Sequence, residues 1–333
     1  MKKLQNDFPR LLQAFFTDRL IKQRRASPHT IAGYRDTFRL LLKFSHKRLN
    51  KLPSAIRNED LDAPLVCAFL EHLERDRHIS PRTRNVRLAA IHSFFQFLAF
   101  ERPEHSAQIK RVLAIPTKRY VRRPVCFLTQ SEIDALLAAP DTTTWVGRRD
   151  RTFLLLAVQT GLRVSELLSL RCQDVVLGTG AHVRCTGKGR KNRCTPLRKD
   201  SVIALRTWLK ERDGEPEDPL FPSTRSGPLG SDGVEYLLRK HVATARIHCP
   251  SLQAKRVTAH VLRHSAAMDW LQHGVDRSVI ALLLGHESAE TTDIYLHASM
   301  KLKEQAIAKT KPKELRSRRY KPDDNLLAFL RNL

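Results

Sequence analysis

Residues 256–271 combine two imidazoles and a guanidinium at the spacing of a helix face. If the stretch is helical, His260, Arg263 and His264 lie at i, i+3 and i+4, on one side of the helix. Two histidines one turn apart are a common spacing for metal ligands. Arg263 opposes a cation, however, and its planar guanidinium matches two oxygens of a phosphate. The stretch therefore favours an anion site, with a structural histidine on an ordinary helix as the alternative.

Two more cationic side chains stand where the chain is expected to turn. Arg163 follows the Thr160-Gly161 break and opens a new helical pattern, so its side chain and the helix amides could face one anion. Glu166, one turn on, could orient Arg163 or form an ordinary surface pair with it. Lys188 stands between two glycines at an expected hairpin tip, where glycine permits close approach to a ligand. A solvated arginine and a solvated tip are the alternatives.

The remaining reactive side chains are His286 and, nine residues later, Tyr295, one of five tyrosines. The phenol of a tyrosine is a possible nucleophile. A tyrosine pKa of ~10 leaves about one phenol in a thousand ionised at neutral pH, so cations and a proton acceptor must activate it. A half-buried structural tyrosine is the alternative for Tyr295.

Two kinds of phosphate site are excluded by the sequence pattern. The chain contains no G-x-x-x-x-G-K-[ST] loop for a nucleotide, and no dense cluster of carboxylates for catalytic magnesium. The six cysteines show no C-x-x-C pair, so neither a zinc cluster nor a disulfide framework is indicated. We therefore expect phosphate chemistry that uses side-chain cations, with no metal and no other cofactor.

The first part of the chain is expected to be a helical domain. Residues 27–48 and 79–100 each open with Ser-Pro, an N-cap followed by proline at the first helical position. Each segment then carries apolar residues at helical spacing, with arginines on the opposite face. We expect residues 1–102 to form this domain. Residues 103–124 contain three prolines and many basic residues, which predicts a basic linker.

Residues 125–310 are expected to form a second domain that mixes helices with a few strands. Thr129 and Glu132 match a capping box, and residues 149–170 predict two helices broken at Thr160-Gly161. Residues 174–197 alternate as short strands, and helical spacing returns over 201–212, 233–247, 260–273, 276–284 and 291–309. Residues 311–333 form a basic tail whose apolar end could dock on a neighbouring subunit or pack on itself. The predicted fold class is mainly α with a small antiparallel β-sheet.

Composition points to a polyanionic partner. Lysine and arginine number 59 against 34 acidic residues, a formal net charge of +25, which favours nucleic acid over a merely solvated basic surface. The basic residues are spread through whole elements, so a membrane partner is not expected. The N-terminus lacks the apolar stretch of a signal peptide, and no apolar run is long enough to span a bilayer. Together with the cysteine pattern, these features favour the cytoplasm.

The ordered set Arg, Lys, His-x-x-Arg, His, Tyr resembles the tyrosine recombinase (phage integrase) family. The resemblance rests on the motifs TGLRVSELLSL, GKGRK, HVLRH, LLGHES and TTDIYLHAS. The resemblance covers nearly the whole chain and implies the family's two-domain architecture, a helical core-binding domain plus an α+β catalytic domain. It also implies a nucleophilic tyrosine and six catalytic positions, all of which this sequence matches: Arg163, Lys188, His260, Arg263, His286 and Tyr295.

Residue chemistry agrees with the roles that the resemblance implies. Arg163 and Arg263 can hold the non-bridging oxygens of the scissile phosphate, which gain charge in the transition state. His260 is suited to accept the tyrosine proton, and Lys188 to protonate the leaving 5′-hydroxyl. His286 would donate to the same phosphate or brace the tyrosine helix.

The resemblance implies an enzyme that cleaves DNA strands through a 3′-phosphotyrosine and exchanges them. Its expected partners are double-stranded DNA and three further copies of the chain, as a homotetramer in the synaptic complex. Accessory recombinases or architectural proteins are further candidate partners. We interpret the chain as a mobile-element integrase rather than a chromosome-dimer resolvase. A non-catalytic DNA-binding regulator, a metal-dependent nuclease and a type IB topoisomerase are the rival hypotheses.

Overall fold

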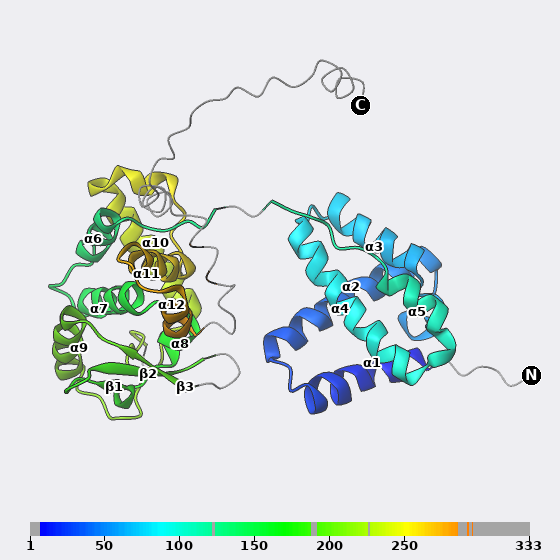
Figure 1. The fold of residues 1–333 in the computed structure, drawn as a ribbon, viewed down its shortest axis with the longest axis horizontal. Helices are drawn as coiled ribbons and strands as arrows, with labels where there is room; N and C mark the ends of the chain where they lie inside the picture. Colours follow the sequence, from blue (N-terminus) through cyan, green and yellow to red (C-terminus); the bar gives the residue numbers. More distant parts are fainter. Residues whose placement is uncertain are drawn as a thin grey trace, which may run out of the picture. The chain divides into compact units, whose positions relative to one another are not determined.

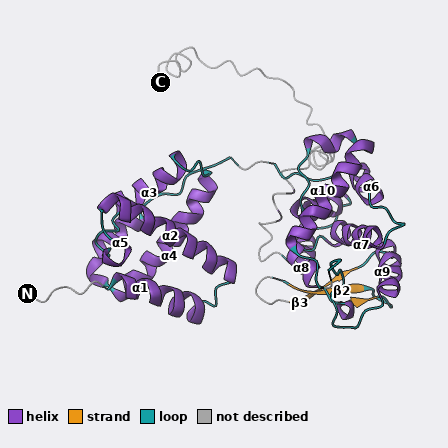
Figure 2. Cartoon of the chain, turned by 180° about the vertical axis from the view of Figure 1, so that it is seen from behind, coloured by secondary structure: helices purple, strands orange, loops and turns teal. Residues whose placement is uncertain are grey.

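The computed structural model describes residues 7–121, 124–187, 192–225 and 227–285, together with Thr292 and Tyr295. The chain divides into two units, residues 1–122 and 123–333, each with a hydrophobic core of its own (Figure 1). The described part of the first unit is helical, whereas the second combines helices with a small sheet (Figure 2). The fold class predicted from the sequence, mainly α with a small antiparallel β-sheet, is therefore confirmed.

The helices of the first unit begin where the sequence places N-caps. The side chains of Ser27 and Ser80 each accept a hydrogen bond from the backbone N–H three residues on, and a proline follows each cap. A cluster of phenylalanine and leucine side chains forms the core of the unit. The elements are α1 (Phe8–Ala14), a π-helical stretch (Phe15–Gln23), α2 (Pro28–Leu49), α3 (Ala63–Arg75), α4 (Pro81–Glu101) and α5 (Ser106–Leu113).

The basic linker expected at residues 103–124 begins later than predicted. Residues Ser106–Leu113 form α5, in which Ile109 and Val112 are buried in the core of the first unit. Two apolar residues three positions apart are enough to fix a short amphipathic helix to an existing core. The prolines and basic residues of the stretch hid this weak periodicity, so the prediction of a linker at 103–115 was wrong.

The sequence pattern predicted that the arginines of α4 face solvent, but two of them bind neighbouring parts of the unit instead. Arg84 is only 6% exposed and donates a hydrogen bond of 2.9 Å to the carbonyl of Pro116. Arg87 donates to the carbonyl of Gly33 in α2 at 3.0 Å. A guanidinium can be buried when acceptors meet its N–H groups. These two residues therefore connect α4 to its neighbours within the unit.

The second unit is built around α7 and the helices packed on it. The capping box of Thr129 and Glu132 at the start of α6 is confirmed. A short 3₁₀ turn precedes the sheet and another precedes α11. The helices are α6 (Gln130–Ala138), α7 (Trp145–Thr160), α8 (Val164–Ser169), α9 (Lys199–Arg212), α10 (Ser231–His248), α11 (Ala259–Gln272) and α12 (Arg277–Leu284).

The sheet of the second unit is antiparallel, with the strand order β1-β2-β3. Its strands are β1 (Val175–Val176), β2 (His182–Thr186) and β3 (Asn192–Pro196). Thr186 pairs with Asn192, and Cys185 pairs with Arg193. Directly paired residues of antiparallel strands point to the same face of a sheet, so the side chains of Cys185 and Arg193 share a face. The two strands of the predicted hairpin are thus paired, and β3 brings Arg193 toward α8. Among the described residues, no helix has the length and apolar character needed to cross a bilayer.

Candidate active site

The break between α7 and α8 places Arg163 at the beginning of a helix. Gly161 ends α7 in the left-handed conformation, with φ of 60°. A Cβ at this position would lie 2.8 Å from Cδ2 of Leu284, so both the backbone angle and the close packing require glycine. Arg163 is the N-cap residue of α8. The helix break predicted at Thr160-Gly161 is therefore confirmed.

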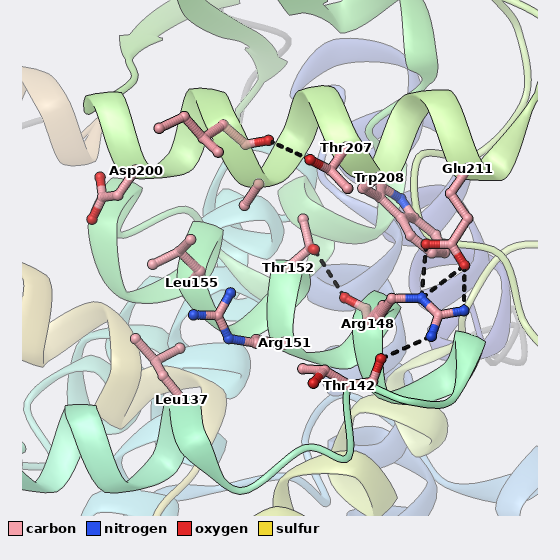
Figure 3. Close-up of a pocket in the computed structure, with 12 residues that line it drawn as sticks. Leu137, Thr142, Arg148, Arg151, Thr152, Leu155, Asp200, Thr207, Trp208 and Glu211 are labelled. Carbon is pink, nitrogen blue, oxygen red and sulfur yellow. Dashed lines mark hydrogen bonds and ion pairs between the residues drawn. The ribbon is translucent and has the colours of Figure 1, made fainter.

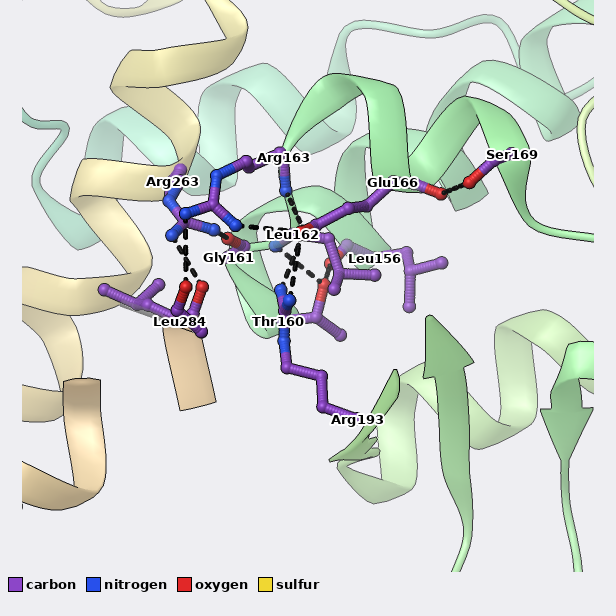
Figure 4. A network of polar contacts seen from close by, with 11 residues as sticks. Leu156, Thr160, Gly161, Leu162, Arg163, Glu166, Ser169, Arg193, Arg263 and Leu284 are labelled. Carbon is purple, nitrogen blue, oxygen red and sulfur yellow. Dashed lines mark hydrogen bonds and ion pairs between the residues drawn. The ribbon is translucent and has the colours of Figure 1, made fainter. Parts of the chain in front are cut away.

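Arg263 is held by the carboxyl ends of two helices. Its Nη1 donates to the carbonyl of Gly161 at the end of α7, and its Nη2 to the carbonyl of Leu284 at the end of α12, each at 2.7 Å (Figure 4). The last carbonyls of a helix lack intrahelical partners and carry partial negative charge, so they suit a guanidinium. Arg263 is 5% exposed, and these two bonds use two of its five N–H groups.

Glu166 orients Arg163 from a buried position. Its Oε1 accepts a bond of 2.9 Å from Arg163 Nη1, and its Oε2 accepts one of 2.7 Å from the Arg163 backbone N–H. Arg163 also donates to the carbonyl of Gly285 at 3.2 Å. Because Glu166 is only 2% exposed, the surface pair that the sequence left open is excluded. Arg163 is therefore fixed through both its backbone and its side chain.

The structure adds Arg193, whose place in the site no local sequence pattern predicted. Its Nη1 and Nη2 donate to the two oxygens of Glu166 at 2.9 and 2.7 Å, in a bidentate pair (Figure 4). A Cβ on Gly285 would lie 2.6 Å from Arg193 Nη1, so this glycine leaves room for the guanidinium. Arg193 thereby ties strand β3 to the helix that begins at Arg163. We call Arg163, Arg193 and Arg263, together with Glu166, the arginine cluster.

The arginine cluster carries an excess of positive charge because three guanidinium groups surround one carboxylate. Burial, and next the charge of Arg163, lower the pKa of Arg263 to about 10. Burial acts to raise the pKa of Glu166, but the bonds from Arg193 and Arg163 outweigh it and hold that pKa below its ordinary value. Glu166 is thus ionised at neutral pH. A bound anion would relieve the remaining repulsion among the guanidinium groups.

Tyr295 lies beside these cations, with its hydroxyl on a histidine. Its side chain is 1% exposed and packs in a small apolar cluster with α11 and α12. The phenol Oη is 2.9 Å from Nδ1 of His264, and the two rings meet edge to face at 5.6 Å. Burial raises the pKa of Tyr295, although the charges of Arg263 and Arg163 act in the opposite direction. The phenol is therefore protonated at neutral pH.

The histidine that contacts the phenol is not the one selected from the sequence. His260, the predicted proton acceptor, is exposed, and its ring stacks on that of His264 at 6.5 Å. The i, i+4 spacing identified both histidines but could not show which one faces Tyr295, 31 residues farther along the chain. Burial, then the charges of His260 and Arg263, lower the pKa of His264 to about 4.

The described residues thus bring together four of the six predicted side chains: Arg163, His260, Arg263 and Tyr295. Lys188 and His286 lie outside the described residues. Within the described ranges, no group of three or more histidine, cysteine, aspartate or glutamate side chains could hold a metal ion. The chemistry that the arrangement supports is electrostatic stabilisation of an anion next to a phenol.

A separate pocket of about 530 Å³ lies between α7 and α9 (Figure 3). Its walls include Leu155, Trp208 and an ion pair in which Arg148 donates to both oxygens of Glu211 at 2.7 to 2.9 Å. None of its lining residues belongs to the arginine cluster. This pocket is therefore not the candidate active site. Its ion pair, Arg148–Glu211, serves as a control for the ion pairs of the buried carboxylate Glu166.

We expect Glu166→Gln to lower the free energy of unfolding of the second unit by about 3–5 kcal/mol at pH 7, because it leaves the partly buried guanidinium groups of Arg163 and Arg193 without their counter-charge. All three tryptophans, Trp145, Trp208 and Trp270, lie in this unit, so their fluorescence during urea denaturation reports its unfolding. The native pKa of Glu166 is below its unfolded value of about 4.3, so its contribution is complete above that pH. The difference from the wild-type chain should shrink as the pH falls below about 4.

Glu211→Gln is the matched control, because Glu211 also binds an arginine but at the surface of the unit. Its effect on the urea midpoint should be smaller, since the side chain of Glu211 is 25% exposed against 3% for Glu166, and water screens the more exposed ion pair more strongly. Equal effects of the two substitutions would contradict a special role for the buried carboxylate.

Comparison with known proteins identifies relatives over nearly the whole chain. Residues 126–301 match the model of the phage integrase family, and residues 14–102 match that of the phage integrase N-terminal SAM-like domain. A protein of Sinorhizobium fredii named as an integrase/recombinase is 60% identical over 323 residues, 97% of both chains. The tyrosine recombinase XerD of Pseudomonas putida is 30% identical, over 90% of this chain and 96% of that one.

Solved structures show the same fold. The XerH site-specific recombinase bound to a palindromic difH substrate aligns with 86% of this chain and 81% of that chain, at a TM-score of 0.70 and 23% identity. A lambda integrase dimer bound to a COC′ core site aligns with 88% of this chain and 96% of that one, at a TM-score of 0.65 and 19% identity.

Proposed function

This chain belongs to the phage integrase family of tyrosine recombinases, and we propose that it breaks and rejoins DNA strands through a bond between Tyr295 and a 3′ phosphate. The observation that carries the proposal is the position of the Tyr295 phenol. It lies next to a histidine and close enough to Arg263 and Arg163 for their charges to act on its pKa. A nucleophile, a base and an anion site are the three parts that phosphoryl transfer needs.

In the proposed reaction, Tyr295 Oη attacks the scissile phosphorus as its proton leaves to a base. The bond between Oη and phosphorus forms, the bond from phosphorus to the 5′ oxygen breaks, and that oxygen takes a proton. A 5′-hydroxyl of another strand then attacks the phosphotyrosine and restores both the DNA bond and the phenol. The ester conserves the bond energy, so neither ATP nor another cofactor is needed.

The guanidinium groups of Arg163 and Arg263 would bind the non-bridging oxygens, whose charge grows in the transition state. Their own bonds to Glu166, Gly161 and Leu284 fix their positions before the substrate arrives. Such preorganisation is favourable because little reorganisation is needed during the reaction. For Lys188 as acid on the leaving oxygen and His286 as a phosphate donor, the support is the family's motif, which both residues match.

The proposed substrate is double-stranded DNA. Support comes from the net charge of +25 and from exposed arginines on the helices of the first unit, such as Arg35, Arg39 and Arg82. We propose that strand exchange takes place in a homotetramer on DNA in the cytoplasm, with accessory recombinases or architectural proteins as further candidate partners. We also propose that the chain acts in the integration of a mobile element. The support is the similarity to the Sinorhizobium protein that is named as an integrase/recombinase.

The domain assignment remains part of the proposal. Residues 1–102 with α5 would form the core-binding domain, and residues 125–310 the catalytic domain. The tail at residues 311–333, proposed to dock on a neighbouring subunit, lies outside the described residues.

A trapped covalent adduct tests the function, and we expect EDTA to leave its yield unchanged. Binding sites are first selected from randomised duplex DNA by the purified chain, and a nick beside the scissile phosphate then allows the cleaved end to diffuse away. A denaturing gel resolves protein joined to DNA. Cations of the arginine cluster supply the charge that a metal would otherwise provide, so chelation should have no effect.

Loss of the adduct in EDTA, with recovery in Mg²⁺ or Zn²⁺, would favour the metal-dependent nuclease. DNA binding with no adduct under any condition would favour the non-catalytic regulator. Adduct formation with relaxation of supercoils but no strand exchange would favour a topoisomerase.

A further inference from the structure

Two histidines on successive turns of α11 differ in what they contact. Nδ1 of His264 is 2.9 Å from the phenol oxygen of Tyr295, the atom that would attack the phosphate. His260, one turn earlier on α11, is exposed, and its ring stacks on that of His264. A group that takes a proton must lie within hydrogen-bond reach of it. His264 meets that condition before any substrate is bound.

The charge around His264 makes it a neutral imidazole in the free protein. Its pKa is lowered to about 4 by burial and by the charges of His260 and Arg263, and the Tyr295 phenol facing it is uncharged. The charges of Arg263 and Arg163 both act to lower the pKa of that phenol. A neutral imidazole has one nitrogen that accepts a hydrogen bond. With the proton on Nε2, Nδ1 can accept the phenolic hydrogen.

We propose that His264, rather than His260, accepts the proton of Tyr295 as the phenol attacks the phosphate. This inference rests on the proposed function. As the bond between Oη and phosphorus forms, the Oη–H bond breaks and the proton passes to Nδ1 of His264. The electron pair of the broken phosphorus–oxygen bond leaves with the 5′ oxygen, which a separate acid protonates. In the rejoining step, His264 returns the proton to the phenol.

The same charges make the transfer depend on the substrate. An imidazolium at His264 would face Arg263 and His260, so it is unfavourable while the anion site is empty. A phosphodiester bound by Arg263 and Arg163 supplies a negative charge that raises the proton affinity of His264. Tyr295 is therefore activated when DNA is in place and stays a protonated phenol otherwise. This arrangement would protect a protein with a reactive nucleophile from unwanted reactions.

The first test measures single-turnover adduct formation by the full-length chain with natural tyrosine or 3-fluorotyrosine at position 295. The fluorinated phenol is more acidic, so it depends less on a base. The amide of an asparagine can stand near the Nδ1 position but cannot take up a proton. We expect His264→Asn to slow cleavage by on the order of 10²–10⁴, and fluorotyrosine to recover roughly tenfold or more of that loss.

His260→Asn is the matched control, one turn earlier on the same helix. Any activity that it loses should not be recovered by fluorotyrosine, because the hydrogen bond to the phenol is made by His264. Recovery of His260→Asn, but not of His264→Asn, would assign the proton to His260 and overturn the proposal. A His264→Asn rate within a few fold of wild type would also overturn it, leaving only a positioning contact. Failure of the wild-type chain to form any adduct would instead reject the proposed function.

A second measurement does not depend on the folding of any His264 variant. Long-range ¹H–¹⁵N spectra of histidine-labelled protein distinguish a protonated from an unprotonated Nδ1. Comparison with Tyr295→Phe identifies the His264 signals, because that substitution removes the hydroxyl next to the ring. We expect Nδ1 to be unprotonated and Nε2 protonated at neutral pH. A proton on Nδ1 would contradict the proposal, since this nitrogen could not then accept the phenolic hydrogen.

Discussion

Tyr295→Phe should abolish the covalent adduct, by on the order of 10⁴-fold or more, while DNA binding stays close to that of the wild-type chain. The phenyl ring can keep the packing of Tyr295 against the apolar side chains of α11 and α12, such as Met268 and Ile280. What is lost is the oxygen that forms the bond to phosphorus, together with its contact to His264. A gel-shift assay measures binding, and a denaturing gel with a nicked substrate measures the adduct.

Tyr236→Phe is the matched control, since it removes the same oxygen from an exposed tyrosine on α10. It should form the adduct at the wild-type rate. If Tyr295→Phe also forms the adduct, Tyr295 is not the nucleophile. If it neither forms the adduct nor binds DNA, tryptophan fluorescence shows whether the second unit has unfolded.

Arg263→Ala should slow cleavage by roughly 10²–10³ or more, as expected for the loss of a donor that stabilises developing charge. The guanidinium has two tasks, because it binds the carbonyls of Gly161 and Leu284 and is placed to bind the phosphate. Arg263→Lys keeps the charge but lacks the planar fork, so it should recover only part of the activity. Arg151→Ala, an exposed arginine of α7, is the control and should cleave at a rate near wild type.

A sulfur-substituted substrate distinguishes the role of Arg263 from that of Lys188. When the 5′-bridging oxygen is replaced by sulfur, the leaving group needs no proton. The substitution should therefore restore cleavage by Lys188→Ala but not by Arg263→Ala. Equal rescue of both variants would contradict the assignment of Lys188 as the acid, and a near-normal rate for folded Arg263→Ala would contradict the proposed role of Arg263.

Local signals in the sequence predicted much of the fold, because they act over a few residues. The Ser-Pro caps at Ser27 and Ser80, the capping box at Thr129 and the helix break at Gly161 each depend on hydrogen bonds or backbone angles of neighbouring residues. Such features are written in the sequence within one helical turn. The break mattered most, since it places Arg163 at the start of α8.

The contacts that complete the candidate site are long-range, and the sequence pattern did not reveal them. Arg193 lies 27 residues from Glu166, and an arginine in a strand near a basic hairpin usually faces solvent. Its partner Cys185 is buried, and this pairing turns Arg193 inward. Likewise, the choice between His260 and His264 depends on where Tyr295 lies against α11. Periodicity gives the face of a helix but not the element that packs on it.

Mass spectrometry of the trapped adduct, after nuclease and trypsin digestion, tests most directly whether Tyr295 is the nucleophile. Cleavage after Arg277 and Lys301 yields a peptide of residues 278–301, in which Tyr295 is the sole tyrosine. We expect a nucleotide joined through its 3′ phosphate to Tyr295 of this peptide, with the other four tyrosines unmodified. A nucleotide on any other residue, or cleaved DNA without a covalent bond to the protein, would contradict it.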